Sequence, residues 1–349
     1  MIFTACGKPA VDPEPAAEVK ADRYVAGIEV GSTGPRGMIV GLGQTAEGVS
    51  TYGELIRLDG ADSDEIFTDD GTLNDEEQDV MLTEIDRLVN LIDQSGKDVR
   101  QIFLVFSIAY TNTANLNRMR SRITARYPRI VIDLLTPELE ARANYFTMQG
   151  RIDLDFSDFI LVDIGGSSTI LSVFDHPRSD TTVAIPLMYG SRSTLEAIDP
   201  LSDFVVRRPQ DRRRMDALVH REVNAELKKI LRSEAFRSRE KVVFVGGLVY
   251  KIIKTLDVPL TGTLIGFSRD SEGDPIYRFL DLVISGDEAL KRGPDYRREE
   301  LYTSLRLLET ISGELKGRNA AFFFERSSWI PGYVLAKLKE EGNKDVKGR

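Results

Sequence analysis

The chain has 349 residues, of which 42% are apolar and 29% charged, a composition typical of soluble globular proteins long enough for two domains. Its net charge of −9 argues against a general nucleic-acid-binding surface, so a polyanionic substrate would need a local basic pocket. The single cysteine, Cys6, excludes a disulfide framework, and two histidines are too few for a histidine-rich metal centre. Oxygen ligands and a hard cation remain as the metal chemistry. No apolar run is long enough to span a bilayer.

The first 22 residues predict a disordered tether, because proline, alanine and charged residues fill positions 8–20. Ahead of them, the segment around Cys6 is similar to the end of a bacterial lipoprotein signal, in which such a cysteine carries lipid. Only five residues precede Cys6, so the apolar region of a signal is not present in the sequence. Two interpretations stay open: a cytoplasmic protein with a free thiol, or a protein lipid-anchored at Cys6 outside the cytoplasm whose start lies upstream.

An apolar segment over residues 25–42 contains the first motif of interest. A strand ends in an acid, Glu29, and is followed by Gly31 and Ser32 and by a turn that carries Arg36. A second apolar run returns from this turn, which predicts a pair of strands joined by a glycine-containing connection.

The sequence next predicts alternating strands and helices. Asn74–Glu77 has the form of a capping box, and the helix that it starts is expected to stop at Gly96. The other expected elements are strands over 51–58, 102–106 and 130–135, a helix over 116–126, and a helix over 138–146 that Pro137 opens. The loop 107–115 follows the carboxyl end of a buried strand, where ligands of α/β proteins bind.

A second motif of the same kind occupies residues 159–175. Gly165 and Gly166 place no Cβ between backbone N–H groups and a ligand such as phosphate, and the carboxylate of Asp163 is suited to a metal ion or a water. For either motif alone, an ordinary hairpin between core strands is the alternative. Two acid–glycine hairpins in one chain favour a phosphate site and two halves of similar architecture.

Further elements follow this hairpin: a strand over 181–186, a helix near 193–198 and a long helix over about 211–233. A strand from Val242 leads into Gly246 and Gly247, where a helix N-terminus can face a phosphate or the glycines simply form a tight turn. Two helices, near 287–291 and 299–315, precede Trp329, which we expect in the core, and a last charged helix.

Five arginines lie within residues 207–214 of this acidic chain. Such a stretch is suited to a track for polyphosphate or nucleotide phosphates. The alternative is a solvated start of the long helix, in which the arginines pair with Asp203, Asp211 and Asp216.

The two hairpins, the Gly246-Gly247 turn and the acidic helix after Pro137 resemble the superfamily of actin, hexokinase and the heat-shock ATPase chaperones. Within it, residues 24 to about 338 are most similar to the family of exopolyphosphatases and guanosine pentaphosphate phosphohydrolases, without the additional C-terminal domain of longer members. The resemblance implies an α/β protein of two ribonuclease H-like domains with a cleft between them. We expect a tether at 1–22, a first domain at 23–136, a second domain at 137–340 and a charged tail at 341–349.

The resemblance also implies roles for particular residues. The segments 29–36 and 163–170 lie on the family's two phosphate loops, and with the later glycine turn they imply these phosphate-binding residues: Gly31, Ser32, Thr33, Arg36, Gly165, Gly166, Ser167, Ser168, Gly246 and Gly247. Glu140 lies where the family has the base that activates water, and Arg142 lies beside it. Glu29 and Asp163 are expected near Mg²⁺. The segment 107–111 with Asn115 resembles a third loop, and 327–332 resembles a closing glycine turn.

Several residues depart from the family's pattern. Ile170 stands where the second loop ends in Glu, and Thr111 stands where the third loop has Arg. These differences remove a carboxylate expected near the metal and a charged phosphate contact. Glu29 replaces an Asp, and Ser167 replaces a loop glycine whose missing Cβ allows close approach. The departures predict reduced or altered catalysis.

Three hypotheses follow for the function. The first is a phosphohydrolase that removes terminal phosphate from inorganic polyphosphate or a guanosine pentaphosphate-type nucleotide, with Mg²⁺ assistance and Glu140 as base. The second is a catalytically weakened sensor that binds a phosphorylated ligand, and the third is an ATPase or sugar kinase built on the same fold. The expected partner is polyphosphate or a phosphorylated nucleotide and not a nucleic acid, while a homodimer and a membrane tether through Cys6 stay open.

Overall fold

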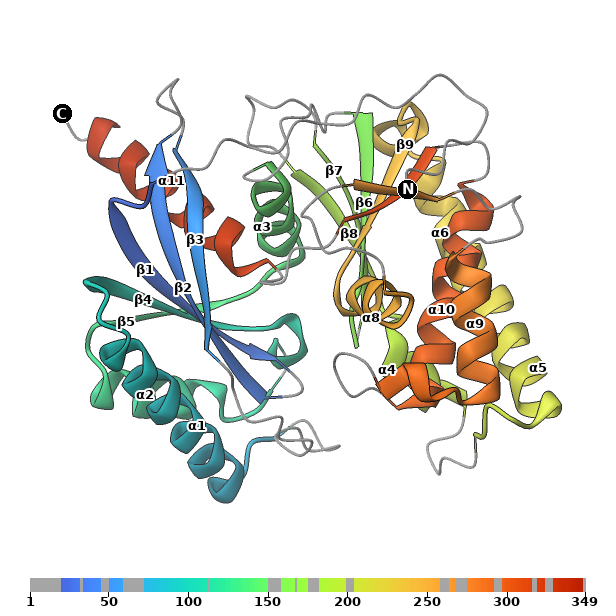
Figure 1. Ribbon diagram of the computed structural model, residues 1–349, viewed down its shortest axis with the longest axis horizontal. Helices are drawn as coiled ribbons and strands as arrows, with labels where there is room; N and C mark the ends of the chain where they lie inside the picture. The colour runs from blue at the N-terminus through green and yellow to red at the C-terminus, as the bar shows by residue number, and fades with distance from the viewer. Residues whose placement is uncertain are drawn as a thin grey trace. The chain divides into compact units, whose positions relative to one another are not determined.

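The computed structural model describes residues 20–31, 34–44, 50–58, 72–111, 113–149, 158–166, 168–174, 182–198, 204–257, 264–267, 275–291, 297–315, 319–323 and 329–347. The chain divides into two compact units (Figure 1). We call them the terminal unit, whose described residues are 20–149 and 329–347, and the central unit, whose described residues are 158–323, with the gaps given above. The central unit is therefore an insertion in the sequence of the terminal unit.

The described part of the terminal unit contains one five-stranded sheet. Its strands are β1 (Arg23–Gly31), β2 (Gly34–Gln44), β3 (Ser50–Leu58), β4 (Val99–Phe106) and β5 (Ile130–Leu134). They lie in the order β3-β2-β1-β4-β5, with an antiparallel meander of β1 to β3 and with β4 and β5 parallel to β1. A meander extended by parallel strands is the ribonuclease H-like arrangement, so the predicted α/β fold class is confirmed for this unit.

Helices cover both faces of this sheet (Figure 1). The helices α1 (Asp75–Gln94) and α2 (Leu116–Arg126) bury Ile85 and Met119 against Ile28 and Leu104 of the sheet. The predicted capping box is confirmed, because the Asn74 side chain accepts a hydrogen bond from the Glu77 N–H and the Glu77 carboxylate accepts one from the Asn74 N–H. The opposite face carries α3 (Pro137–Gln149) and α11 (Ile330–Lys347).

The position of α3 and α11 corrects two expectations about domain limits. The expected boundary between residues 136 and 137 does not match the division of the chain, because α3 packs against α11 inside the terminal unit. Residues 341–347 continue α11 as a helix and do not form a separate tail. A helix from the end of the chain thus completes the unit that the N-terminal part begins.

The central unit repeats the same sheet topology in its described residues. Its strands are β6 (Phe159–Ile164), β7 (Thr169–Phe174), β8 (Thr182–Leu187), β9 (Lys241–Val245), β10 (Leu264–Phe267) and β11 (Asn319–Phe323). The order is β10-β11-β9-β6-β7-β8, in which β6 to β8 form the meander and β9 and β11 run parallel to β6. The antiparallel edge strand β10 is the only addition to the pattern among these described strands. The predicted duplication is confirmed.

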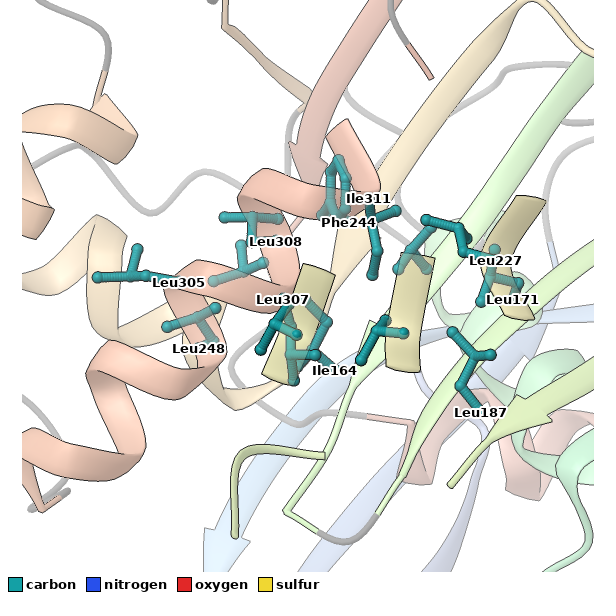
Figure 2. Packing of buried hydrophobic residues seen from close by; sticks show 14 of the residues in the cluster. Ile164, Leu171, Leu187, Leu227, Phe244, Leu248, Leu305, Leu307, Leu308 and Ile311 are labelled. Atoms are coloured by element: carbon teal, nitrogen blue, oxygen red, sulfur yellow. The ribbon is translucent and has the colours of Figure 1, made fainter. Parts of the chain in front are cut away.

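The helices of the central unit pack on this second sheet and on one another, with α6, α8 and α10 in contact with its strands. The described helices are α4 (Ser191–Ile198), α5 (Pro209–Leu218), α6 (Asn224–Leu231), α7 (Glu234–Arg237), α8 (Gly247–Thr255), α9 (Pro275–Ser285) and α10 (Arg298–Glu314). Figure 2 shows Leu305, Leu308 and Ile311 of α10 close to Phe244 of β9 and Leu248 of α8, all members of one buried cluster. None of the helices described is both long and apolar enough to cross a membrane.

Three expectations for the central unit need correction. The helix expected over 211–233 is interrupted by a π-helical turn, Val219–Val223, between α5 and α6. The helix expected near 287–291 is a short 3₁₀ turn, Glu288–Lys291. The helix α9 and the strands β10 and β11 are not among the elements expected from the sequence, although α9 is amphipathic and begins at a proline.

Candidate functional site

The turn of the first hairpin lies at the carboxyl end of β1, the central strand in the sheet of the terminal unit. Because β1, β4 and β5 are parallel, their carboxyl ends meet at the same edge, where α/β proteins bind ligands. Glu29 of β1 is the direct cross-strand partner of Arg36 of β2, and Gly31 pairs with Gly34 at the turn. Direct partners point to the same face of a sheet, so the carboxylate and the guanidinium emerge side by side.

Glu29 also faces its own loop. A Cβ added to Gly31 would lie 3.5 Å from Glu29 Oε1, so the carboxylate stands beside the glycine. Along the strand, Gly27 shares the face of Glu29, and a Cβ at Gly27 would lie 2.5 Å from Ile330 Cγ2 of α11. The acid and the arginine therefore lie on the face that α11 covers.

The segment after β4 supports the first loop. The Ser107 N–H donates to the Val30 carbonyl at 3.0 Å, and the Tyr110 hydroxyl donates to the Gly31 carbonyl at 3.3 Å. Burial, with a smaller contribution from Glu77, raises the pKa of Tyr110, which keeps the hydroxyl protonated and able to donate. Sequence reasoning associated this segment with the site but did not single out Tyr110.

Thr111 stands where the family's third loop has Arg, and the expected loss of a charged contact there agrees with its position. Thr111 is exposed, and its hydroxyl donates back to the Ile108 carbonyl at 2.7 Å within the 3₁₀ turn Ile108–Tyr110. Asn115, at the start of α2, has a φ of 66° in the left-handed region, which asparagine adopts more readily than most residues. The third loop therefore contributes backbone support and no charge at position 111.

Glu140 lies in the first turn of α3, shortly after the carboxyl end of β5. Its N–H donates to the Thr136 carbonyl at 2.9 Å, and the residue is half-buried. Glu140 therefore lies in the helix that follows the carboxyl end of β5, and the first loop follows the carboxyl end of the parallel strand β1 in the same sheet. The helix N-terminus favours an ionised carboxylate there.

Arg142 is engaged elsewhere. Its Nη1 donates to Glu340 Oε1 of α11 at 3.0 Å, while its buried Nε has no hydrogen-bond partner among the residues that the structure describes. Residues two apart on a helix do not share a face, so Arg142 does not accompany Glu140. The contact indicates that Arg142 joins α3 to α11.

The closing glycine of the sequence analysis also belongs to this helix pair. Gly332 lies inside α11 and not in a turn, and its N–H donates to the Thr147 hydroxyl at 3.0 Å. A Cβ at Gly332 would lie 1.8 Å from the Ala143 carbonyl oxygen, so only glycine allows this approach of the two helices. Trp329, as predicted, is buried beside this contact at the start of α11.

Asp133 of β5 ties α11 to the sheet. Its carboxylate accepts a hydrogen bond from the Tyr333 hydroxyl and forms an ion pair with Lys337 Nζ at 2.8 Å. Burial opposes ionisation, but the bonds from Lys337 and Tyr333 outweigh it and lower the pKa of Asp133. The helix α11 is thus held by two charged contacts after Gly332, one to β5 through Lys337 and one to α3 through Glu340.

In the central unit, the second loop is held by the start of α4. The N–H of Ser191 donates to the Gly165 carbonyl at 3.0 Å, and the N–H groups of Arg192 and Ser193 donate to the Gly166 carbonyl at 2.8 and 3.2 Å. In a trans peptide the carbonyl and the following N–H point in opposite directions. With the Gly165 carbonyl directed at α4, the Gly166 N–H points away from the helix, as binding of an anion requires.

A glycine that sequence reasoning missed makes this arrangement possible. A Cβ on Gly190 would lie 2.4 Å from the Gly166 carbonyl oxygen and 2.5 Å from the Ser168 nitrogen. The neighbouring Tyr189 carbonyl accepts a hydrogen bond from the Thr169 hydroxyl at 2.7 Å. The signal available in the sequence was a glycine between a strand and a short helix. The structure adds the reason for it, which is the close contact of Gly190 with the Gly166 and Ser168 backbone.

Asp163 lies at the carboxyl end of β6 and is 7% exposed. Its cross-strand partner is Ile170, which is 2% exposed, so the carboxylate stands beside an apolar side chain. A Cβ on Gly246 would lie 2.5 Å from Asp163 Oδ1, and Gly246 has a φ of 102°, which glycine accommodates. Gly247 begins α8, so Asp163 stands by a helix N-terminus, where negative charge is favoured.

The acids of the site fit only one form of Mg²⁺ binding. Among the described residues no three acidic, histidine or cysteine side chains come together as a metal cage. Mg²⁺ is commonly held by one or two carboxylates, with substrate phosphate and water as the remaining ligands, and a single carboxylate such as Asp163 suits that mode. Ser32, Thr33, Ser167 and Cys6 lie outside the described residues.

Comparisons with known proteins agree on the fold. No protein-family model matches the sequence, and no curated protein matches it. Among solved structures, the Aquifex aeolicus member of the Ppx/GppA protein family aligns over 91% of this chain and 98% of its own, with a TM-score of 0.67 and 15% identity. An exopolyphosphatase from Cytophaga hutchinsonii aligns over the same shares, with a TM-score of 0.68 and 13% identity.

The chain has the Ppx/GppA fold. The alignment spans nearly the full length of both relatives, so the likeness includes both units and the returning helix α11. The fold that the sequence motifs predicted is therefore confirmed. At this level of identity the likeness concerns the fold, and the roles of individual residues have to be argued from this chain.

Proposed function

We propose that this protein is a phosphohydrolase that removes terminal phosphate from inorganic polyphosphate or from a guanosine pentaphosphate-type nucleotide. The observation that carries the proposal is the second loop, whose carbonyls are tied to α4 so that the Gly166 N–H points away from that helix. The first hairpin, with Glu29 opposite Arg36, supplies a second element of the same kind. The Ppx/GppA fold supports the same assignment.

The proposed chemistry divides among these elements. Phosphoanhydride hydrolysis requires donors and cations that balance the phosphoryl charge and a group that positions the attacking water. The proposed phosphate ligands are Gly31, Ser32, Thr33 and Arg36 in the first loop and Gly166, Ser167 and Ser168 in the second. Gly165, expected to bind phosphate, instead donates its N–H to the Ser168 carbonyl at 2.9 Å and shapes the loop. Glu140, on the first turn of α3, is the proposed base.

Arg142, Gly246 and Gly247 take supporting roles in this proposal. Arg142 holds α3 through Glu340, and the two glycines allow Asp163 to lie against the start of α8. Asp163 in the second loop and Glu29 in the first are each proposed as a single-carboxylate ligand for Mg²⁺. When bound, Mg²⁺ would neutralise part of the phosphate charge.

The direct test measures phosphate release from polyphosphate by the wild type and by Glu140→Gln. Loss of the base is expected to lower the rate by about 10²-fold or more, while polyphosphate binding is retained. Glu138→Gln is the matched control, because Glu138 is an exposed acid in the same helical turn. A wild-type rate no greater than background would reject the enzyme assignment, whereas equal wild-type and Glu140→Gln rates above background would reject Glu140 as the base.

A second candidate function is a sensor that binds the phosphorylated ligand with little turnover. The observation in its favour is Ile170, which is buried directly opposite Asp163 where the resemblance places a carboxylate. Calorimetry distinguishes the two functions: tight polyphosphate binding without phosphate release favours the sensor. Mg²⁺-dependent ATP binding that polyphosphate does not compete with would instead favour the ATPase or sugar kinase alternative.

A further inference from the structure

A group of arginines on α5 lies apart from the loops described above. Four of them are exposed, and we call them the arginine surface: Arg207, Arg208, Arg213 and Arg214. They flank or belong to the first two turns of α5, in a chain whose net charge is −9. Charge of one sign gathered in a protein of the opposite sign creates a local field that attracts counter-charged ligands.

Among the described residues, Asp211 pairs with two of these arginines, as the alternative interpretation predicted, and this one carboxylate balances only part of their charge. Asp211 is 5% exposed, and its Oδ2 accepts a hydrogen bond from the Val205 N–H at 3.0 Å. The Nη1 atoms of Arg208 and Arg214 lie 3.9 and 4.0 Å from its two oxygens, so two guanidiniums share one buried carboxylate.

The other expected acidic partner is engaged by different groups. Asp216 pairs with Arg306 Nε at 2.8 Å and accepts a hydrogen bond from the Tyr302 hydroxyl at 3.1 Å. The expectation that Asp216 pairs with the arginines of 207–214 is therefore wrong for the contacts described. Asp203 lies outside the described residues.

The backbone under the arginine surface is held in place. Arg212 Nη1 donates to the Val206 carbonyl at 2.7 Å, which fixes the entry to α5. Arg207 Nη2 reaches the Ser285 carbonyl, 3.4 Å away, at the end of α9. A fixed backbone presents the exposed guanidiniums with less entropic cost on binding.

The arginine surface is connected to the second loop through α10. Glu300 pairs with Arg192 at 3.5 Å, in the turn of α4 that binds the Gly166 carbonyl. Two residues further along α10, Tyr302 contacts Asp216 of α5. The loop and the surface are therefore joined through α10 within the central unit.

We propose that the arginine surface is a second binding site for the polyphosphate chain, separate from the site of the terminal phosphate; this rests on the proposed function. Guanidinium groups bind phosphate oxygens through planar, charge-assisted hydrogen bonds. A short substrate occupies the loops alone, whereas a long chain also reaches the arginines. The surface therefore raises affinity for long chains through the effective concentration of a tethered ligand.

The test compares long-chain polyphosphate with tripolyphosphate, using the full chain carrying Arg213→Ser and Arg214→Ser. We expect about a tenfold loss of affinity for the long chain, a weaker dependence of that affinity on salt, and unchanged kinetics with tripolyphosphate. The matched control carries Arg232→Ser and Arg237→Ser, which removes the same charge from exposed positions on the same unit. Arg232 follows the end of α6, which is about 27 Å of helix beyond Arg214, and Arg237 lies further on, in α7.

Four outcomes would overturn the proposal: no binding of the long chain by the wild type, no loss in the variant, an equal loss in the control, or equal displacement of polyphosphate by single-stranded RNA. The last outcome would identify a general nucleic-acid surface. Phosphate release from tripolyphosphate tests the proposed function by itself in the same samples. Its absence rejects the enzyme, whereas binding of the long chain still decides the role of the arginines.

Discussion

The hairpins of the two units have the same strand pairing but carry different side chains at the paired positions. In each, the acid and the residue seven positions later are direct cross-strand partners near the carboxyl edge of a sheet. The terminal unit pairs Glu29 with Arg36, whereas the central unit pairs the buried Asp163 with the buried Ile170. Strand pairing therefore sets the framework, and the chemistry depends on single positions that can change without altering it.

The two loops are also held differently. A side chain, the Tyr110 hydroxyl, donates to the first loop at Gly31. Backbone N–H groups of α4 hold the second loop, and Gly190 permits the close contact. Substitution of the polar side chain Tyr110 should therefore loosen the first loop, and addition of a Cβ at Gly190 should displace the second.

The largest effect is expected from Ile170→Glu, which would make the second hairpin resemble the first in carrying two polar partners. A carboxylate at a 2% exposed position opposite Asp163 is expected to cost about 3 kcal/mol of unfolding free energy, through desolvation and like-charge repulsion. Mg²⁺ should restore part of this loss and raise the rate of phosphate release. Urea unfolding with and without Mg²⁺ measures the change.

Ile170→Gln is the control for this experiment, because glutamine has the shape of glutamate without its charge. If Mg²⁺ restores stability to the Ile170→Glu variant but not to the Ile170→Gln variant, the metal binds beside Asp163. Equal behaviour of the two variants would contradict the proposed metal site in the central unit.

The next largest effect is expected from Gly190→Ala. The new Cβ would contact the Gly166 and Ser168 backbone at about 2.5 Å, which backbone atoms relieve only by moving, so we expect a loss of about 2–3 kcal/mol of stability. Gly31→Ala is the comparison in the first hairpin. Its Cβ would have no neighbour nearer than 3.5 Å, so its cost should stay below about 1 kcal/mol. Equal costs in urea unfolding would contradict the difference in anchoring.

A smaller effect is expected from Tyr110→Phe, which removes the bond to the Gly31 carbonyl. The expected cost is about 1 kcal/mol, and looser positioning of the first loop should raise KM more than it lowers kcat. Thr169→Val is the counterpart in the central unit, because it removes the bond to the Tyr189 carbonyl. If Tyr110→Phe leaves KM unchanged, the hydroxyl does not position the loop.

The smallest effect concerns pH and the terminal unit alone. Because the pKa of Asp133 is lowered below its ordinary value of 3.8, its bonds to Tyr333 and Lys337 stabilise the folded state above that value. This contribution is lost as the pH falls through the lowered pKa. We expect Asp133→Asn to be less stable than the wild type by about 1 kcal/mol near pH 6, with the difference vanishing in acid. A difference that persists at low pH would contradict this origin.

The sequence predicts those parts of the molecule that depend on local patterns. The capping box at Asn74, the strands of the terminal unit and both glycine hairpins follow from spacing and apolar alternation, whereas the direct pairing of each acid with the residue seven positions later is known only from the structure. The engagement of Arg142 with Glu340 leaves no such signal, because 198 positions separate them. The π-helical turn over Val219–Val223 lies inside a run whose apolar period is that of one helix. Gly190 is recognisable only once the Gly166 backbone is placed against it.

The insertion of the central unit has a consequence for synthesis on the ribosome. The first sheet is complete once β5 has emerged, but Gly27 waits for Ile330 of α11, which comes about 180 residues after α3. At about 5–20 residues per second this delay lasts roughly 10–35 s. During that time the face of the sheet that α11 later covers is available to chaperones, and the central unit has time to fold first. Release of the last helix from the ribosome is then the step that closes the terminal unit.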